Sequence, residues 1–232
     1  MKIIHNSLND VTYNKIREDI MNMTLEPGTD VSVQKLSERY GVSRTPVREA
    51  VVRLQQSGLV EIYPQRKTVV SKIDIDRIHE EWFIRTTLES AVVDEFIRKC
   101  SELVTDTLQE IINKQKRYID KDRFMEFYLK DNRFHQLIFE TADESLSWQT
   151  IEDTATHYNR IRLMCGKIEG NSQKIIEEHE RMVEAARKRD VEAMRAVVKE
   201  HSYYLIDQVK EMMKQYPQFF QCNNSDWINN YI

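Results

Sequence analysis

The side chains of this chain that are best suited to chemistry are one aspartate and three histidines in its second half. Asp131 and His135 stand four residues apart, so within a helix they share one face. That face is otherwise apolar, and a buried carboxylate without a partner is costly. His179 and His201 lie eleven residues before and after Asp190. An antiparallel helix pair that turns at this point places both histidines at the same height, facing each other.

The spacing leaves two interpretations of this group open. Aspartate and histidine are ligands of divalent transition metals such as zinc, nickel or manganese, and a zinc–histidine bond measures ~2.0–2.1 Å. The alternative is a polar cluster that satisfies its own hydrogen bonds inside the core. His157 is a possible further ligand, although Tyr158 and Arg160 beside it leave its direction undecided.

A metal with open coordination positions can also activate water, so a metal-dependent hydrolase is another possibility. Hydrolysis would need a positioned base as well. Glu178 and Glu200 each precede a histidine of the group by one position, which is about 100° round a helix. Both are predicted to point away from the group, and we therefore expect this chain not to be an enzyme.

Long helices must position these side chains, and the composition favours them. The 232 residues include only 5 Gly and 4 Pro, most of them between Pro27 and Pro64. Because Gly and Pro interrupt helices, the chain beyond Pro64 should be mostly helical. Apolar periodicity predicts helices at 74–99, 103–118, 122–141, 145–165, 171–188 and 190–215, and the short loops between them make successive helices antiparallel.

The first part of the chain predicts a winged helix-turn-helix. After a helix that begins near Asp10, Ser32 caps a short helix that Gly41 ends in a left-handed conformation, and a second helix follows. This spacing matches a helix-turn-helix, whose second helix enters the major groove of DNA. The β-branched segments 59–63 and 68–72 then predict a hairpin, which forms the wing.

Arginines mark the outer face of the second helix. Arg44 and Arg48 share this face at the N-terminal end with Thr45, and Arg53 lies a turn further on. Arginine recognises guanine O6 and N7 with two hydrogen bonds, worth ~1–3 kcal/mol of discrimination. The alternative interpretation is an ordinary solvated helix surface.

Charge also favours DNA as a partner of the first part of the chain. Arg66 and Lys67 at the tip of the hairpin can reach phosphates or the minor groove. Residues 1–74 carry 11 Lys and Arg against 9 Asp and Glu, whereas the remaining residues carry 23 against 29. A basic head on an acidic body favours a polyanion at the head, with chance scatter as the alternative.

The composition excludes several other classes of protein. No apolar run approaches the ~20 residues of a membrane span, and the first residues lack the apolar stretch of a secretory signal. Cys100, Cys165 and Cys222 are odd in number and far apart, which argues against a disulfide framework. We expect a cytoplasmic protein with no membrane partner.

Residues 41–50, Gly-Val-Ser-Arg-Thr-Pro-Val-Arg-Glu-Ala, together with 25–28, 36–40 and 54–60, resemble the DNA-binding domain of GntR-family transcription regulators. The resemblance implies that the second helix recognises an operator, assisted by the preceding helix and the wing. The residues implicated are Gln34, Lys35, Arg44, Thr45, Arg48, Arg53, Arg66 and Lys67.

The segments 82–89, 131–135, 178–180 and 189–193, followed by His201, resemble the effector-binding FCD domain of the FadR subgroup. The resemblance implies a divalent metal, zinc first with nickel or manganese as alternatives, whose coordination a small carboxylate completes. The implied ligands are Asp131, His135, His179 and His201.

Three residues are candidates for contact with the effector. Arg85 falls in an inward helical row and can pair with a carboxylate, and an internal ion pair with Glu89 is the alternative. Tyr158 and Arg162 are weaker candidates for the same pocket.

Together these patterns predict a mainly α protein. The expected parts are a winged helix-turn-helix domain (1–73), an antiparallel helical bundle of about six helices that binds metal and effector (74–216), and a C-terminal tail of unknown role (217–232). The expected function is that of a ligand-responsive bacterial transcription regulator that binds a near-palindromic operator as a homodimer. The alternatives are a DNA-binding regulator with a purely structural metal and no effector, and the metal-dependent hydrolase considered above.

Overall fold

The computed structural model describes residues 7–64, 66–166, 168 and 170–222. These residues form two compact units. The first unit contains the described residues up to Ile75 and those that follow Gln215, and the second contains the described residues between them. No described helix has the length and apolar character that crossing a membrane requires.

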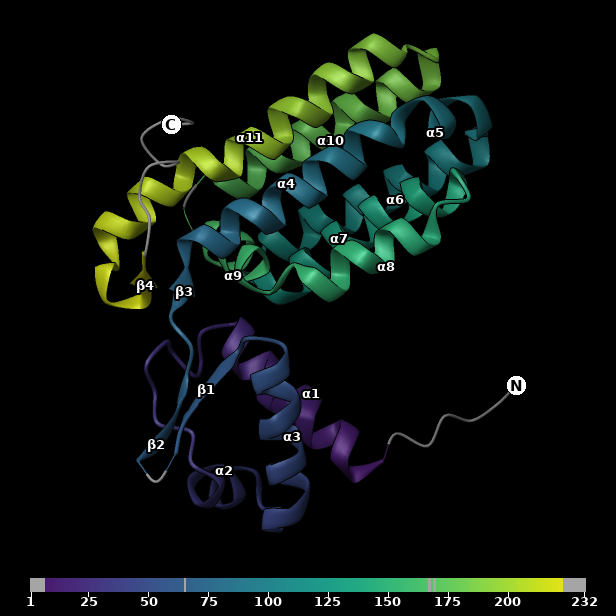
Figure 1. The fold of residues 1–232 in the computed structure, drawn as a ribbon. Helices are drawn as coiled ribbons and strands as arrows, with labels where there is room; N and C mark the ends of the chain where they lie inside the picture. The colour runs from purple at the N-terminus through teal and green to yellow at the C-terminus, as the bar shows by residue number, and fades with distance from the viewer. Residues whose placement is uncertain (1–6, 65, 167, 169, 223–232) are drawn as a thin grey trace. The chain divides into compact units, whose positions relative to one another are not determined.

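The first unit is a winged helix-turn-helix. Its elements are α1 (Leu8–Met21), α2 (Val33–Tyr40), α3 (Arg44–Gln56), β1 (Val60–Tyr63), β2 (Lys67–Val70), β3 (Ile73–Asp74), a 3-10 turn (Pro217–Phe219) and β4 (Phe220–Gln221) (Figure 1). The hairpin of β1 and β2 is antiparallel, with Val60 opposite Val70. Fully buried Ile16, Val47 and Leu54 join α1 to α3.

Short-range capping sets the ends of the helices in this unit. Ser7, rather than Asp10, is the N-cap of α1, because the Ser7 hydroxyl accepts the Asp10 N–H at 3.2 Å. Asp10 stands three residues inside, where its negative charge still suits the positive end of the helix. Ser32 caps α2 as predicted, and Gly41 ends α2 with φ of 65° in the left-handed region.

The end of the described chain belongs to the first unit. Residues 217–232 were expected to form a tail of unknown role, and Phe220–Gln221 pair in parallel with Ile73–Asp74. Phe220 is buried, and the Gln221 amide donates to the Asp74 carboxylate at 3.1 Å. The rest of the predicted tail, residues 223–232, lies outside the described residues.

The second unit is a helical bundle. Its helices are α4 (Ile75–Ala91), α5 (Val93–Lys99), α6 (Glu102–Ile119), α7 (Phe124–Thr141), α8 (Ser145–Thr154), α9 (Thr156–Gly166), α10 (Asn171–Lys188) and α11 (Val191–Gln215). The pairs α6–α7, α10–α11 and α6–α10 make the most extensive contacts, and α10 and α11 run side by side (Figure 1). This architecture and the winged unit confirm the predicted fold class.

Two of the six predicted helices are interrupted. The helix expected at 74–99 is only distorted at Val92, which keeps a right-handed helical conformation. The helix expected at 145–165 is broken at Ala155, where ψ is 64°. Neither position carries Gly or Pro, so the sequence gives no local sign of the interruption.

A distant carboxylate explains the second interruption. Glu81 of α4 is buried and accepts the backbone N–H of Tyr158 at 2.8 Å, with the N–H groups of Thr156 and His157 nearby. The first N–H groups of a helix have no partner within the helix, so a carboxylate at this end stabilises a new helix start. Glu81 therefore acts as a long-range N-cap for α9, and α9 carries two residues predicted to contact the effector.

We expect Glu81→Ala to lower the free energy of unfolding by ~1–2 kcal/mol, because the first turn of α9 loses its acceptor in a buried setting. Urea denaturation followed by circular dichroism measures the change. Glu80→Ala is the matched control, since the Glu80 side chain is 66% exposed and should matter by less than ~0.5 kcal/mol. Equal effects of the two substitutions would argue against the capping role.

Candidate metal and effector site

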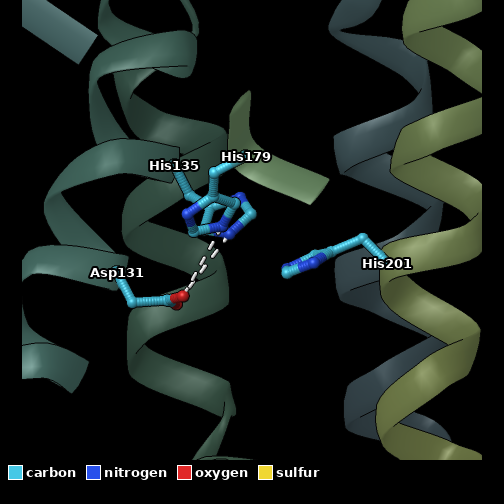
Figure 2. Close-up of side chains that lie close together, drawn as sticks. All are labelled: Asp131, His135, His179 and His201. Carbon is cyan, nitrogen blue, oxygen red and sulfur yellow. Dashed lines mark ion pairs between the residues drawn. The ribbon is translucent and has the colours of Figure 1, made fainter. Parts of the chain in front are cut away.

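Four side chains from three helices of the bundle meet at one point. Asp131 and His135 come from α7, His179 from α10 and His201 from α11. One ligand atom from each lies within 4.8 Å of the others. Figure 2 shows the α7 pair pointing toward His201, which extends from the opposite side. Sequence spacing placed these residues on inward faces, and the tertiary structure brings all four together.

The separations between these groups are small. The Asp131 carboxylate lies 3.8 Å from Nε2 of His135 and 3.6 Å from Nε2 of His179. The ring centroids of His179 and His201 are 5.1 Å apart. These two histidines therefore face each other across the α10–α11 pair, as their equal distances from Asp190 predicted.

Each histidine has an oxygen acceptor on its outer nitrogen. Nδ1 of His135 lies 3.0 Å from Glu89, Nδ1 of His179 lies 3.1 Å from Gln115, and Nδ1 of His201 lies 2.7 Å from Glu178. An acceptor at Nδ1 holds the proton there and leaves the lone pair on Nε2. All three lone pairs are therefore available on the side of the ring away from these acceptors.

Two of the three inner nitrogens lack hydrogen-bond partners among the described residues. Nε2 of His135 and Nε2 of His179 are buried and have no hydrogen bond within the part of the chain that the structure describes. A buried polar atom left without a partner is destabilising, so such atoms call for a further group. Three imidazole nitrogens and a carboxylate oxygen form a donor set that suits zinc, nickel or manganese. The residues present therefore fit a divalent metal.

The charges in the cluster also suit a cation. Burial alone would raise the pKa of Asp131, but the Arg162 guanidinium beside it lowers the pKa below its usual value, so the carboxylate is ionised. Burial lowers the pKa of His135, and it lowers that of His179 well below 6.5. Neutral imidazoles and one carboxylate are the forms that bind metals.

Glu178 departs from its prediction. It was expected to point away from the histidines, and instead it is 1% exposed and contacts Nδ1 of His201. Glu178 precedes His179 by one position on α10, and its side chain points toward α11 because the two helices pack against each other there. Glu200 is exposed and pairs with Arg181 at 2.8 Å, away from the cluster. Glu178 supports a histidine on its outer nitrogen, so it is not placed as a base beside the Nε2 atoms.

A cavity borders the cluster. Its volume is about 40 Å³, measured as the space open to the centre of a water molecule, which is room for a few waters. Asp131 and His201 contribute to its wall, as do all three predicted effector residues, Arg85, Tyr158 and Arg162. His157, considered as a further ligand, is buried on α9 but is not part of the cluster of four.

Arg85 both forms the internal ion pair with Glu89 and faces the cavity, the two arrangements that the sequence left open. Its Nε donates to Glu89 at 2.9 Å, which is the internal ion pair. The side chain also lines the cavity, and its Nη1 is buried without a hydrogen-bond partner among the described residues. One amino group of Arg85 is therefore left for a further acceptor.

Arg162, on α9, contacts the Asp131 carboxylate. It forms an ion pair with Asp131 and donates to Asn159 at 2.8 Å. Its guanidinium lies over the Tyr128 ring, 4.8 Å from the ring centroid. These contacts hold a second cation at the wall of the cavity beside the cluster.

The residues predicted to read DNA bases are exposed in the first unit. Arg44, Thr45 and Arg48 lie at the N-terminal end of α3 with their side chains in solvent. Within the described residues, Arg44 and Arg48 form no ion pair. Arg53 differs, because it pairs with Asp10 at 2.9 Å and lies over the Tyr13 ring at 3.9 Å. Those contacts hold Arg53 against α1.

The remaining predicted DNA contacts are also on the surface. Gln34 donates to Glu38 at 3.0 Å, and Lys35 pairs with Asp30 at 2.7 Å. Arg66 and Lys67 are exposed at the turn between β1 and β2. These exposed pairs are weak and would exchange readily for phosphate contacts.

Sequence reasoning missed Gln115, which supports His179 and whose place in an apolar helical row could have revealed it. Gln115 is fully buried and holds Nδ1 of His179. It follows the buried Ile111 by four positions and Ile112 by three, so it continues an apolar helical row. A polar side chain in such a row requires a buried partner, and this was the available signal.

Comparisons with known proteins agree with this arrangement. The family described as "FCD domain" matches residues 82–203, and the family described as "Bacterial regulatory proteins, gntR family" matches residues 8–70. The first match contains the four clustered residues and the cavity-lining arginines. The second contains α1 to the end of the hairpin.

Whole-length relatives are transcriptional regulators. The chain is 31% identical over 226 residues to the HTH-type transcriptional repressor RspR of Escherichia coli (strain K12), covering 96% of this chain and 94% of the relative. It is 26% identical to the gluconate operon transcriptional repressor of Bacillus licheniformis, covering 78% and 76%. The solved structure of E. coli McbR/YncC has the same fold, with a TM-score of 0.72, 21% identity and coverage of 90% and 99%.

Proposed function

Because this chain belongs to the gntR family of bacterial regulatory proteins and carries an FCD domain, it is a transcriptional regulator rather than an enzyme, and we propose that it responds to a small carboxylate held beside a divalent metal. In this proposal Asp131, His135, His179 and His201 bind the metal. The protein binds a near-palindromic operator as a homodimer in the cytoplasm, with one winged unit on each half-site.

One observation carries the metal assignment. Each of the three histidines has its Nδ1 against an oxygen acceptor, while the buried Nε2 atoms of His135 and His179 have no partner in the described part of the chain. A self-satisfied polar cluster would pair those nitrogens. A bound metal supplies the missing partner and open positions for an anionic ligand.

The carboxylate assignment rests on the cavity wall. Arg85 and Arg162 are the cationic groups of the described cavity wall, and Nη1 of Arg85 is without a partner among the described residues. Arginine binds carboxylates through paired, charge-assisted hydrogen bonds. The Arg85 guanidinium lies over the Tyr158 ring, 5.8 Å from the ring centroid, and this contact helps to position Arg85.

The DNA assignment rests on α3. Arg44, Thr45 and Arg48 project from the end of a recognition helix into solvent, where a base edge is within reach. Lys35 of α2 and the pair Arg66 and Lys67 of the wing supply phosphate contacts. Gln34 extends the same surface, whereas Arg53 is held by α1 and contributes mainly by supporting α3.

We expect His179→Ala to remove most of the bound metal, because it deletes one of four ligands. Mass-spectrometric metal analysis of purified protein measures metal per chain. His79→Ala is the control, since His79 lies outside the cluster and should leave the metal content unchanged. If His179→Ala retained full metal content, His179 would not be a ligand.

We expect Arg48→Ala to weaken specific DNA binding by ~1–3 kcal/mol if Arg48 reads a base. A fluorescence-anisotropy titration against a DNA site selected by the protein from a random pool gives the affinity at fixed salt. Arg117→Ala removes the same charge from an exposed position in the second unit and should leave the affinity unchanged. Comparable binding by the Arg48 variant and the wild type would remove Arg48 from the recognition surface.

Coupling between carboxylate and operator tests the regulatory role. Binding reciprocity requires that the selected DNA site change carboxylate affinity by the same factor that the carboxylate changes DNA affinity, typically ~1–3 kcal/mol. Calorimetric titration of organic acids into metal-loaded protein, with and without the DNA site, measures this. Identical carboxylate affinities in the two titrations would leave a structural metal without an effector role.

A further inference from the structure

The cavity beside the cluster has two unlike ends. Its lining includes Phe124, Phe127, Leu163, Ile175 and Leu205, which offer only carbon surface. The cationic side chains among the described lining residues, Arg85 and Arg162, are both tied to the cluster, because Arg162 pairs with Asp131 and Arg85 pairs with Glu89, which contacts His135. The cavity therefore presents charge at one end and an apolar wall over the rest.

The polar groups of the wall are mostly committed to other contacts. Tyr204 donates its hydroxyl to Asn171. Arg162 is engaged by Asp131 and Asn159. The ring faces of Tyr128 and Tyr158 lie against the two guanidinium groups. Nη1 of Arg85 is buried without a partner among the described residues and is left for a ligand, together with the hydroxyl groups of Tyr128 and Tyr158 beside the two arginines.

These features discriminate between classes of organic acid. A sugar acid buries several hydroxyl groups, and each one without a hydrogen-bond partner weakens binding. A dicarboxylate brings a second charge, and the second cation of the described lining, Arg162, is already paired with Asp131. An acid with one carboxylate and an apolar body satisfies both ends of the cavity, because its body displaces water from carbon surface.

We propose that the effector is a monocarboxylate with an aromatic or branched aliphatic body, whose carboxylate lies toward Arg85 and whose body lies against Phe124, Phe127 and Leu205. This inference rests on the proposed function, since it names the class of acid that the site selects. It assigns Phe124 and its apolar neighbours as the residues that determine specificity.

The test is calorimetric titration of the full, zinc-loaded chain with benzoate, 4-methylpentanoate, acetate, gluconate and succinate. Benzoate or 4-methylpentanoate should bind about tenfold or more tightly than the other three. Gluconate or succinate binding as tightly as benzoate overturns the proposed class but leaves the carboxylate effector in place, and so does equal binding by all five. If no acid binds to the metal-loaded protein, the proposed effector role fails together with the class.

A variant separates recognition of the body from recognition of the carboxylate. Phe124 is half-buried at the first position of α7, so Phe124→Ser should fold normally. It should weaken benzoate binding about fivefold while leaving acetate binding unchanged. Leu129→Ser makes a similar change on the same helix at a side chain that is 54% exposed, and both affinities should stay at wild-type values. Equal benzoate affinity in Phe124→Ser and wild type contradicts the assigned body position.

Discussion

The bundle depends on keeping His135 and His179 neutral and Asp131 ionised within a few ångströms of each other inside an apolar core. Burial favours the neutral forms of His135, His179 and Asp131, so the pKa of each histidine is lowered while Asp131 needs compensation to stay ionised. Arg162 supplies it from the cavity wall. The balance leaves lone pairs and one negative charge at the centre of the bundle, a combination that attracts a divalent cation.

The outer partners of the histidines tie this centre to the rest of the bundle. Glu89 of α4 contacts His135, Gln115 of α6 contacts His179, and Glu178 of α10 contacts His201 of α11. Each ring is thus fixed from behind by a different element, and Phe134 stacks on His179 with centroids 4.1 Å apart. Glu89 also pairs with Arg85, so one buried chain of contacts runs from the cavity through α4 to a histidine of the cluster. In sequence, α4 follows β3 of the winged unit directly.

A second buried carboxylate decides the shape of the cavity. Glu81 starts α9 at Thr156 by accepting N–H groups of its first turn. The break at Ala155 sets the direction of α9 independently of α8, and α9 carries Tyr158 and Arg162 to the wall. Burial raises the pKa of Glu81 to about 7, although the N–H groups of α9 and Arg77 favour its charged form. Two carboxylates of α4, Glu81 and Glu89, therefore organise the two sides of the same site.

The sequence alone determined the elements, because helix periodicity, capping residues and turn glycines act over a few positions: Gly41 ends α2, and the equal distances of His179 and His201 from Asp190 place them at one height. It also contained the motifs that resemble a DNA-binding domain and an FCD domain. The break at Ala155, the inward turn of Glu178 and the pairing of β3 with β4 were decided by the tertiary structure. Each depends on a partner far along the chain: Glu81 is 77 residues from Tyr158, and Glu178 is 23 from His201. A side chain one position from an inward residue faces solvent or a neighbouring helix according to where that neighbour packs, and local periodicity does not contain this information.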